Sequence, residues 1–203
     1  LWTFALGTET RTLVCPLEAD NPVTRSNDGR ADPWGGFWIG TMGFAAEPGA
    51  GSIYRFYKGE LRRLVPDVTI SNAICFPADR SCAYYTDTAI GKIMRQPLDA
   101  RDGWPSGAAD VFLDLSAEEF GADGAVVDCD GNLWNAQWGA GRVACYSPEG
   151  ALLETVSAPT PQTSCPAFGG DDMATLFITT AAEGREPGLA GQTFMAATGA
   201  TGQ

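Results

Sequence analysis

The sequence predicts an all-β fold of the β-propeller type, and three observations support this prediction. First, the 203 residues include 25 glycines and 13 prolines, which suits many short strands joined by turns. Second, no long run of apolar residues follows the 3.6-residue period of an amphipathic helix. Third, similar segments recur at intervals of 40 to 50 residues, which is typical of propeller blades.

The repeat consists of two series of strands. In the first series, a turn of small and acidic residues precedes a strand with an aromatic residue near its centre. These aromatic residues are separated by 47, 49 and 43 positions: Trp38, Tyr85, Trp134 and Phe177. In the second series each strand begins with a glycine, and the glycines are 40, 50 and 50 positions apart: Gly51, Gly91, Gly141 and Gly191.

Each unit is therefore predicted to contain four strands. A first strand leads through an Asp/Gly turn into the aromatic second strand, and a loop leads into the glycine-led third strand and then a fourth. A β-sandwich with evenly spaced hairpins is the alternative, but it gives no reason for a long repeat. The nearest helical candidate is the segment S-A-E-E-F-G at 116–121, which we expect to form at most about two turns in a connection.

The phase of the repeat predicts where the chain begins within a blade. Residues 1–14 align with residues 53–65 with a difference of one residue, so the chain is expected to begin at a third strand. At its other end the chain stops just after a third strand. We therefore expect a single β-propeller domain over residues 1–203 that is truncated at its N-terminus.

Charge and composition exclude several functional classes. The formal net charge is -12 and the pI is about 4.3, which disfavours binding to nucleic acid or anionic membranes. Histidine is absent, which excludes a Ser-His-Asp triad and histidine-ligated metals. No apolar run of about 18 residues and no basic-then-apolar leader is present, so we expect no membrane span and no signal peptide. The expected location is cytoplasmic.

Several residues are predicted to be structural. Trp38 and Trp134 occupy positions on second strands that should face the core. Asp128 and Asp130 lie in a D-x-D-G turn and are expected to form that turn, since no further ligands follow at the spacing of a calcium loop. Cys165 is expected to be buried and inert. All six cysteines lack C-x-x-C spacing and are predicted to be reduced.

The first strand of each unit opens with a polar residue in the same phase. These residues are Asn27, Asn72, Asp123 and Ser164. Because first strands line the channel of a propeller, equivalent side chains should converge near one axial point. Asn, Asn and Asp there offer oxygen ligands that suit Ca²⁺, Mg²⁺ or Mn²⁺ and that Zn²⁺ also accepts. The alternative, that Asn72 and Asp123 only stabilise turns, is disfavoured by the repetition in three blades.

Four sequence motifs carry a resemblance to a known family. They are R-S-N-D-G-R-A-D-P-W-G-G-F-W-I-G-T-M at 25–42, I-S-N-A-I-C-F-P-A-D at 70–79, D-G-A-V-V-D-C-D-G-N-L-W-N-A-Q-W-G-A-G-R-V at 123–143 and T-S-C-P-A-F-G-G at 163–170. In order and spacing they resemble the regucalcin/gluconolactonase family, also called senescence marker protein lactonases. The resemblance implies a six-bladed β-propeller, of which this chain would cover about four to four and a half blades.

The resemblance also implies an activity and a site. It implies that one divalent cation is held by a Glu, an Asn and an Asp at the channel mouth and that sugar lactones are hydrolysed. By this correspondence Asn72 and Asp123 are metal ligands, and Asp123 is also the catalytic base. Arg25 and Asn27 correspond to residues near the substrate. The Glu ligand lies in the first blade of the family and has no counterpart in this chain.

The resemblance leaves alternatives open. Ala45 stands where some relatives have an acidic residue that contacts substrate, and Ala73 replaces a usual glycine. We expect a gluconolactonase-type hydrolase that acts on a small sugar lactone as a monomer or weak dimer, with Ca²⁺ or Zn²⁺ as cofactor and Mn²⁺ or Mg²⁺ as alternatives. The competing hypotheses are an organophosphate or aryl-ester hydrolase on the same fold, and a non-catalytic calcium-binding propeller or inactive fragment.

Overall fold

The computed structural model describes residues 1–186 and 188–203, and their regular secondary structure is entirely β. The strands are β1 (Trp2–Ala5), β2 (Thr10–Leu13), β3 (Thr24–Ala31), β4 (Phe37–Gly43), β5 (Gly51–Tyr57), β6 (Glu60–Val68), β7 (Ser71–Cys75), β8 (Cys82–Asp87), β9 (Lys92–Pro97), β10 (Asp110–Asp114), β11 (Gly121–Val127), β12 (Leu133–Trp138), β13 (Arg142–Tyr146), β14 (Leu152–Ser157), β15 (Thr163–Gly169), β16 (Thr175–Thr180) and β17 (Thr193–Ala197). The predicted all-β class is confirmed.

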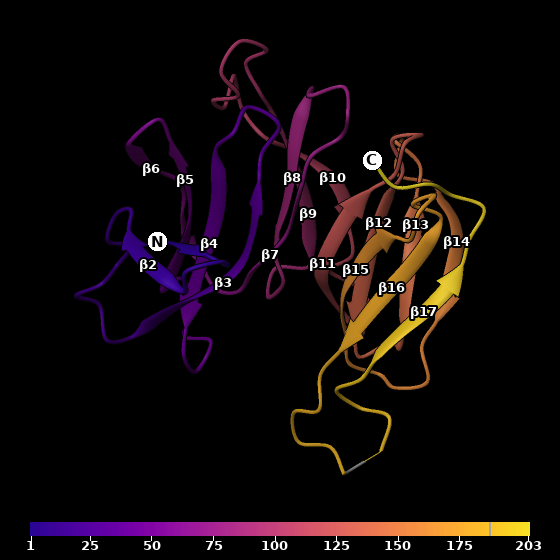
Figure 1. Cartoon of the computed structure of the whole chain (residues 1–203). Helices are drawn as coiled ribbons and strands as arrows, with labels where there is room; N and C mark the ends of the chain where they lie inside the picture. The colour runs from indigo at the N-terminus through magenta and orange to yellow at the C-terminus, as the bar shows by residue number, and fades with distance from the viewer. Residues whose placement is uncertain (187) are drawn as a thin grey trace.

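The strands form a propeller-like arrangement of four blades. β3–β6, β7–β10, β11–β14 and β15–β17 are antiparallel meanders whose strands pair in sequence order, and β1–β2 is a separate hairpin. The inner strands β3, β7, β11 and β15 contact one another in that order, and Figure 1 shows the four sheets side by side around them. A complete ring of six blades stays a prediction.

The two repeat series identified from the sequence correspond to the second and third strands of each blade. The aromatic markers lie in β4, β8, β12 and β16, and the glycine-led segments are β5, β9, β13 and β17. The helical candidate forms a turn and bends between β10 and β11 instead. There the side chain of Asp114 accepts a hydrogen bond from the Ser116 amide at 3.1 Å, and such local bonds compete with helix formation.

The hydrophobic core lies between neighbouring blades. Three buried clusters fill the three spaces between the four sheets. Trp38 and Trp134 are 0% and 1% exposed, so their predicted place in the core is confirmed. Trp38 packs edge-to-face on Phe76 at 5.6 Å, and Trp134 packs in the same way on Phe168 at 5.5 Å. Each marker thus contacts the next blade at or just beyond the end of its inner strand, which fixes the angle between blades.

Asp128 organises the turn that precedes β12. Its carboxylate accepts hydrogen bonds from the amides of Asp130 and Asn132 at 3.0 and 2.8 Å, and from Trp134 Nε1 at 2.9 Å. Asp128 is therefore a turn-forming residue, as predicted. The six cysteines carry free thiols. No segment within the described ranges forms a helix long and apolar enough to cross a membrane.

Candidate functional site

One cavity of about 440 Å³ contains all four residues that the sequence assigned to a site. Arg25 and Asn27 enter it from β3, Asn72 from β7 and Asp123 from β11. The remaining lining residues are Met42, Phe44, Ala45, Ala46, Ile70, Thr88, Trp138 and Glu183. The convergence of equivalent positions on three successive inner strands is thus observed. The fourth equivalent residue, Ser164, instead shares a hydrogen bond of 2.8 Å with Thr179.

A β-bulge accompanies the polar residue on each inner strand. The pairing register shifts between Ser26 and Gly29 on β3 and between Asn72 and Cys75 on β7. It shifts again between Ala122 and Ala125 on β11 and between Thr163 and Cys165 on β15. A bulge adds an unpaired residue and redirects the local side chains. The bulges therefore let the side chains of Asn27, Asn72 and Asp123 enter the cavity.

The polar side chains of the cavity form a chain of hydrogen bonds across the inner strands. Arg25 Nη1 donates to Asn27 Oδ1 at 2.9 Å. Asn27 Nδ2 donates to Asn72 Oδ1 at 3.1 Å and to the Ser71 carbonyl at 2.9 Å. Because both amide hydrogens of Asn27 are used within the protein, this residue holds Arg25 and Asn72 in fixed positions.

Asp123 is the cavity residue whose ionisation is most strongly perturbed. Its pKa is raised to about 7, mainly by burial; the Gly124 amide opposes this rise and the nearby Asp28 carboxylate adds to it. Desolvation disfavours the charged carboxylate, and a second negative charge acts in the same direction. The Asp123 backbone is held by Asn135 Nδ2, which donates to its carbonyl at 3.0 Å. A half-buried carboxylate with a pKa near neutrality is typical of functional sites.

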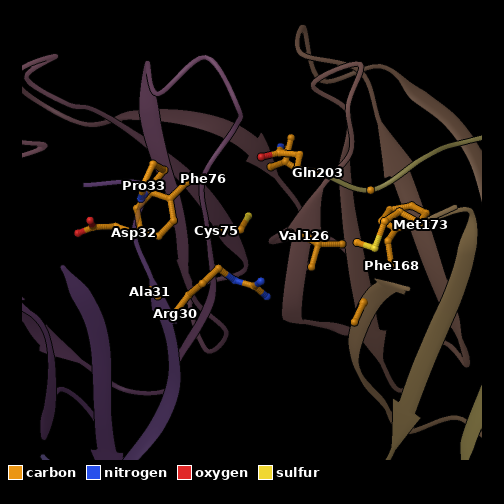
Figure 2. A pocket seen from close by; sticks show the side chains of 13 residues that line it. Arg30, Ala31, Asp32, Pro33, Cys75, Phe76, Val126, Phe168, Met173 and Gln203 are labelled. Atoms are coloured by element: carbon orange, nitrogen blue, oxygen red, sulfur yellow. The ribbon is translucent and has the colours of Figure 1, made fainter. Parts of the chain in front are cut away.

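Asp28 and Arg30 occupy the channel beside the candidate site. Asp28 accepts a hydrogen bond of 2.7 Å from the Ile74 amide, and burial raises its pKa. Arg30 crosses from β3 to donate to the carbonyls of Ile74 at 2.9 Å and Ala125 at 3.1 Å. Figure 2 shows Arg30 pointing into a second cavity, of about 460 Å³, with Cys75 nearby. Arg30 therefore cross-links three inner strands.

The thiols near the channel are poor nucleophiles. Burial, with a smaller contribution from the Asp28 carboxylate, raises the pKa of Cys165 to about 11. Burial also raises the pKa of Cys75. Both groups are thus protonated at neutral pH, when the thiol is a weak nucleophile and metal ligand. Cys165 is half-buried rather than fully buried as predicted, but its raised pKa agrees with the prediction that it is inert.

The donor set of the cavity fits a hard divalent cation. Asn72 contributes an amide oxygen and Asp123 a carboxylate, both oxygen donors of the kind that Ca²⁺ and Mg²⁺ prefer. Among the described residues no positively charged group lowers the pKa of the half-buried Asp123 carboxylate, so a cation would remove the cost that its raised pKa reflects. In the described part of the chain no three His, Cys, Asp or Glu residues cluster as a complete ligand set. Asn72 and Asp123 could therefore supply two ligands, and a complete set would need further donors.

Thr88, Trp138 and Glu183 are among the cavity residues that sequence reasoning missed. Thr88 and Trp138 lie at the ends of second strands, which were examined only for their aromatic centres. Glu183 lies in the loop before β17, where Gln162 Nε2 donates to its carbonyl at 3.0 Å. A search for polar or aromatic residues at the ends of the second strands would have found the first two.

The space beside Asp123 depends on Gly124. A Cβ atom there would lie 2.6 Å from Cys165 Sγ and 2.8 Å from the Ser164 carbonyl oxygen. We expect Gly124→Ala to lower the free energy of unfolding by about 1–3 kcal/mol, because the inner strands β11 and β15 would have to separate. Urea denaturation measures the change. Gly7→Ala is the control, since no atom lies within 4 Å of its added Cβ; equal stability of the two variants would contradict the expected contact.

The comparisons with known proteins agree with this fold. The sequence model of the "SMP-30/Gluconolactonase/LRE-like region" matches residues 1–182. The chain is 43% identical over 167 residues to a Rhizobium meliloti protein with the provisional name sugar lactone lactonase, covering 82% of this chain and 57% of that protein. It is 38% identical over 173 residues to the 6-deoxy-6-sulfogluconolactonase of Pseudomonas putida, covering 82% of this chain and 59% of that protein. The chain thus spans less than two thirds of the length of these relatives.

The fold also matches a solved structure of the same kind. A calcium-binding protein, regucalcin, from Agrobacterium tumefaciens superimposes with a TM-score of 0.94 and 41% sequence identity. The match covers 100% of this chain and 70% of that protein. The blade arrangement described above is therefore shared over the whole chain.

Proposed function

The chain belongs to the SMP-30/gluconolactonase/LRE-like family, and from this premise we propose that it hydrolyses sugar lactones with the help of one divalent cation. The carrying observation is that Arg25, Asn27, Asn72 and Asp123 share one cavity. The lactonase names of its relatives support the reaction. The calcium-binding regucalcin neighbour supports a cation.

Asp123 is the proposed catalytic base. It accepts a proton from a water molecule while the water oxygen bonds to the carbonyl carbon of the lactone. The ring C–O bond then breaks, and the former ring oxygen takes up a proton to become a hydroxyl group of the sugar acid. A pKa of about 7 makes Asp123 basic enough for this task near neutral pH. A divalent cation bound to Asn72 and Asp123 would supply Lewis-acid polarisation of the carbonyl.

Arg25 and Asn27 are proposed to bind and orient the substrate. Arg25 uses Nη1 for its bonds to the Ser26 carbonyl and Asn27, and its Nε and Nη2 donate to no other described residue, which leaves them available to a ligand. A planar fork of donors suits sugar hydroxyls and the carboxylate of the product. Asn27 keeps the fork in place through its Oδ1, and its contact with substrate stays a prediction.

The 203 residues are proposed to be part of a longer six-bladed propeller. The two relatives are longer than this chain, because the match covers only 57% and 59% of their lengths. The β1–β2 hairpin exposes 64% of Trp2, 54% of Phe4 and 52% of Leu13, a group of apolar side chains that a neighbouring blade would cover. Activity is therefore best measured on the longest reading frame that contains the chain.

The proposed function is tested with a substrate panel. Aldonolactones of five- and six-carbon sugars, an aryl ester and a phosphotriester are each assayed after treatment with chelator and after addition of Ca²⁺, Zn²⁺, Mn²⁺ or Mg²⁺. We expect lactone turnover that the chelator abolishes and a cation restores. Faster phosphotriester turnover would assign the organophosphate hydrolase alternative instead. Cation binding without turnover of any substrate would assign a non-catalytic calcium-binding propeller.

The raised pKa of Asp123 predicts a pH dependence of the reaction. The carboxylate must be ionised to accept a proton, so kcat/KM should rise with pH through an acid limb at about 7 when cation is scarce. A bound cation favours the ionised form, so the limb should move to lower pH as the cation concentration rises. Rate profiles between about pH 5 and 9 measure this shift. If the pH of the acid limb did not depend on cation concentration, the catalytic base would not be a ligand of the cation.

A further inference from the structure

The hydroxyl group of Thr88 lies between the inner strands β7 and β11. Thr88 directly follows β8 and lines the candidate cavity. Its Oγ1 donates to the Ala122 carbonyl on β11 at 2.6 Å. It also accepts from Asn72 Nδ2 on β7 at 2.9 Å. One side chain thus connects the amide of Asn72 to the residue immediately before Asp123.

The polarity of these two bonds fixes the orientation of the Asn72 amide. A backbone carbonyl can only accept, so the single Thr88 hydroxyl hydrogen must point to Ala122. Only lone pairs of Thr88 Oγ1 are then left for Asn72, and only the NH₂ group of Asn72 can use them. Its Oδ1 must therefore face away from Thr88.

The Asn27 amide imposes the same orientation from the other side. Its Nδ2 donates to the Ser71 carbonyl at 2.9 Å, which fixes which end of this amide is the donor. The second hydrogen on Nδ2 is then directed at Asn72 Oδ1 at 3.1 Å. The two fixed carbonyl acceptors, at Ser71 and Ala122, thus agree in placing the oxygen of Asn72 away from Thr88. A chain of hydrogen bonds that all run in the same donor-to-acceptor direction holds its side chains more rigidly than the same bonds would separately.

We propose that Thr88 is a positioning residue that holds Asn72 with its oxygen, rather than its NH₂ group, presented to the cavity. The inference rests on the proposed function, because an Asn72 oxygen is needed only if this residue is a ligand. Residues that orient metal ligands through hydrogen bonds typically contribute 10–100-fold to metal affinity. Thr88 contacts neither the substrate nor the reacting atoms in this role.

The backbone around Thr88 is built to keep its hydroxyl in place. The Thr88 amide donates to the Ile70 carbonyl at 2.9 Å. The neighbouring Asp87 side chain accepts from the amides of Thr69 and Ile70 at 2.8 and 3.0 Å. Gly121 leaves the necessary room, since a Cβ there would lie 2.6 Å from Thr88 Cγ2. The close approach of Thr88 to β11 therefore requires a residue without a side chain at this position.

The experiment compares Thr88→Val, which removes the hydroxyl but keeps the β-branched shape, with Thr88→Ser, which keeps the hydroxyl. The first readout is hydrogen exchange of the Asn72 side-chain NH₂ group by NMR, assigned through the signal that Asn72→Asp removes. We expect exchange about tenfold faster or more in Thr88→Val, and near the native rate in Thr88→Ser. Native exchange in Thr88→Val would overturn the proposal.

Calorimetric titration with Ca²⁺ and Mn²⁺ gives the second readout. Thr88→Val should bind about 10–100-fold more weakly than the unchanged protein, and Thr88→Ser should recover most of the affinity. Equal affinities of Thr88→Val and the unchanged protein would contradict the proposal. If the unchanged protein binds no cation, the proposed function fails, while the exchange readout still decides whether Thr88 orients Asn72.

A measurement on the unchanged protein decides the case if Thr88→Val does not fold. The Asn72 NH₂ group should exchange about tenfold or more slowly than that of an exposed asparagine such as Asn21. Exchange at the exposed rate would show that the bond to Thr88 does not persist, and would overturn the proposal. Gly121→Ala, which keeps the hydroxyl but crowds Thr88, should speed exchange of the same group.

Discussion

Replacing Asp123 by asparagine is expected to lower kcat/KM for a sugar lactone by about 10²–10⁴-fold, because the substitution removes the proposed base but keeps the shape of the side chain. The variant should also bind the divalent cation more weakly, since the only carboxylate among the four cavity residues assigned from the sequence is lost. Steady-state kinetics on the sugar lactone that is turned over fastest measure the first effect. A variant with native kcat/KM would refute the role of Asp123.

The same substitution should stabilise the cation-free protein at alkaline pH. Burial raises the pKa of Asp123 from 3.8 to about 7, so between about pH 4 and 7 the native state binds more protons than the unfolded state. Stability therefore falls as the pH rises through this window. Above about pH 7, Asp123→Asn should raise the free energy of unfolding by about 2 kcal/mol. This is less than the full pKa shift of Asp123 would give, because solvent screens the partly exposed side chain. Below about pH 4 the gain should vanish.

Denaturation with urea at about pH 4 and pH 8, with chelator present, checks this linkage. Ser164→Ala is the matched control, because Ser164 occupies the equivalent position on β15 but does not line the cavity. It should keep both activity and the native pH dependence. An equal effect of Asp123→Asn on the free energy of unfolding at the two pH values would show that burial does not raise the pKa of the Asp123 carboxylate.

Asp32→Asn should produce the largest loss of stability, about 3–5 kcal/mol. Asp32 Oδ2 accepts from Arg55 Nε at 2.6 Å, and both side chains are 0% exposed. The Arg55 guanidinium also lies 4.4 and 4.5 Å from the ring centroids of Tyr57 and Trp104. Removing the carboxylate leaves a buried charge without its counter-ion.

Asparagine is the substitution of Asp32 that removes the ion pair while changing least else. Asp32 Oδ1 accepts from the amides of Trp34 and Gly36 at 2.9 and 2.8 Å, and the oxygen of an asparagine can keep these bonds. Its NH₂ group would then face the Arg55 donor, so the variant tests the ion pair and not the turn. Urea denaturation measures the change.

Glu60→Gln is the control, since the Glu60–Arg62 pair is exposed at 53% and 49%. It should change the free energy of unfolding by less than the error of the measurement. Similar losses for Asp32→Asn and Glu60→Gln would contradict the role of burial.

Repetition explains why much of the fold and site could be predicted. Because each blade repeats its strands in the same order, Trp38 and Trp134 could be assigned to the core from their spacing alone. The same phase of the repeat predicted that Asn27, Asn72 and Asp123 would lie close together. Residues at equivalent positions of a repeat converge by symmetry, so their meeting requires no information about individual contacts.

Contacts that occur in only one blade could not be predicted in this way. Arg30 bridges three inner strands, and Thr88 joins β7 to β11, but the spacing of the repeat predicts neither set of bonds. The bulges that direct Asn72 and Asp123 into the cavity also depend on local geometry, including a positive φ of 56° at Ala73. Such features arise from packing between segments that are far apart in the sequence, so the period of the repeat does not predict them.

The cation site at Asn72 and Asp123 is tested most directly by calorimetric titration of Ca²⁺, Zn²⁺ and Mn²⁺ into the longest reading frame that contains the chain and into its Asp123→Asn variant. The expected result is that at least one cation binds the unchanged protein with one equivalent and a Kd in the micromolar range or below, and binds Asp123→Asn about tenfold or more weakly. Equal binding by both proteins, or no binding of any cation by the unchanged protein, would contradict a cation-assisted lactonase site at this cavity.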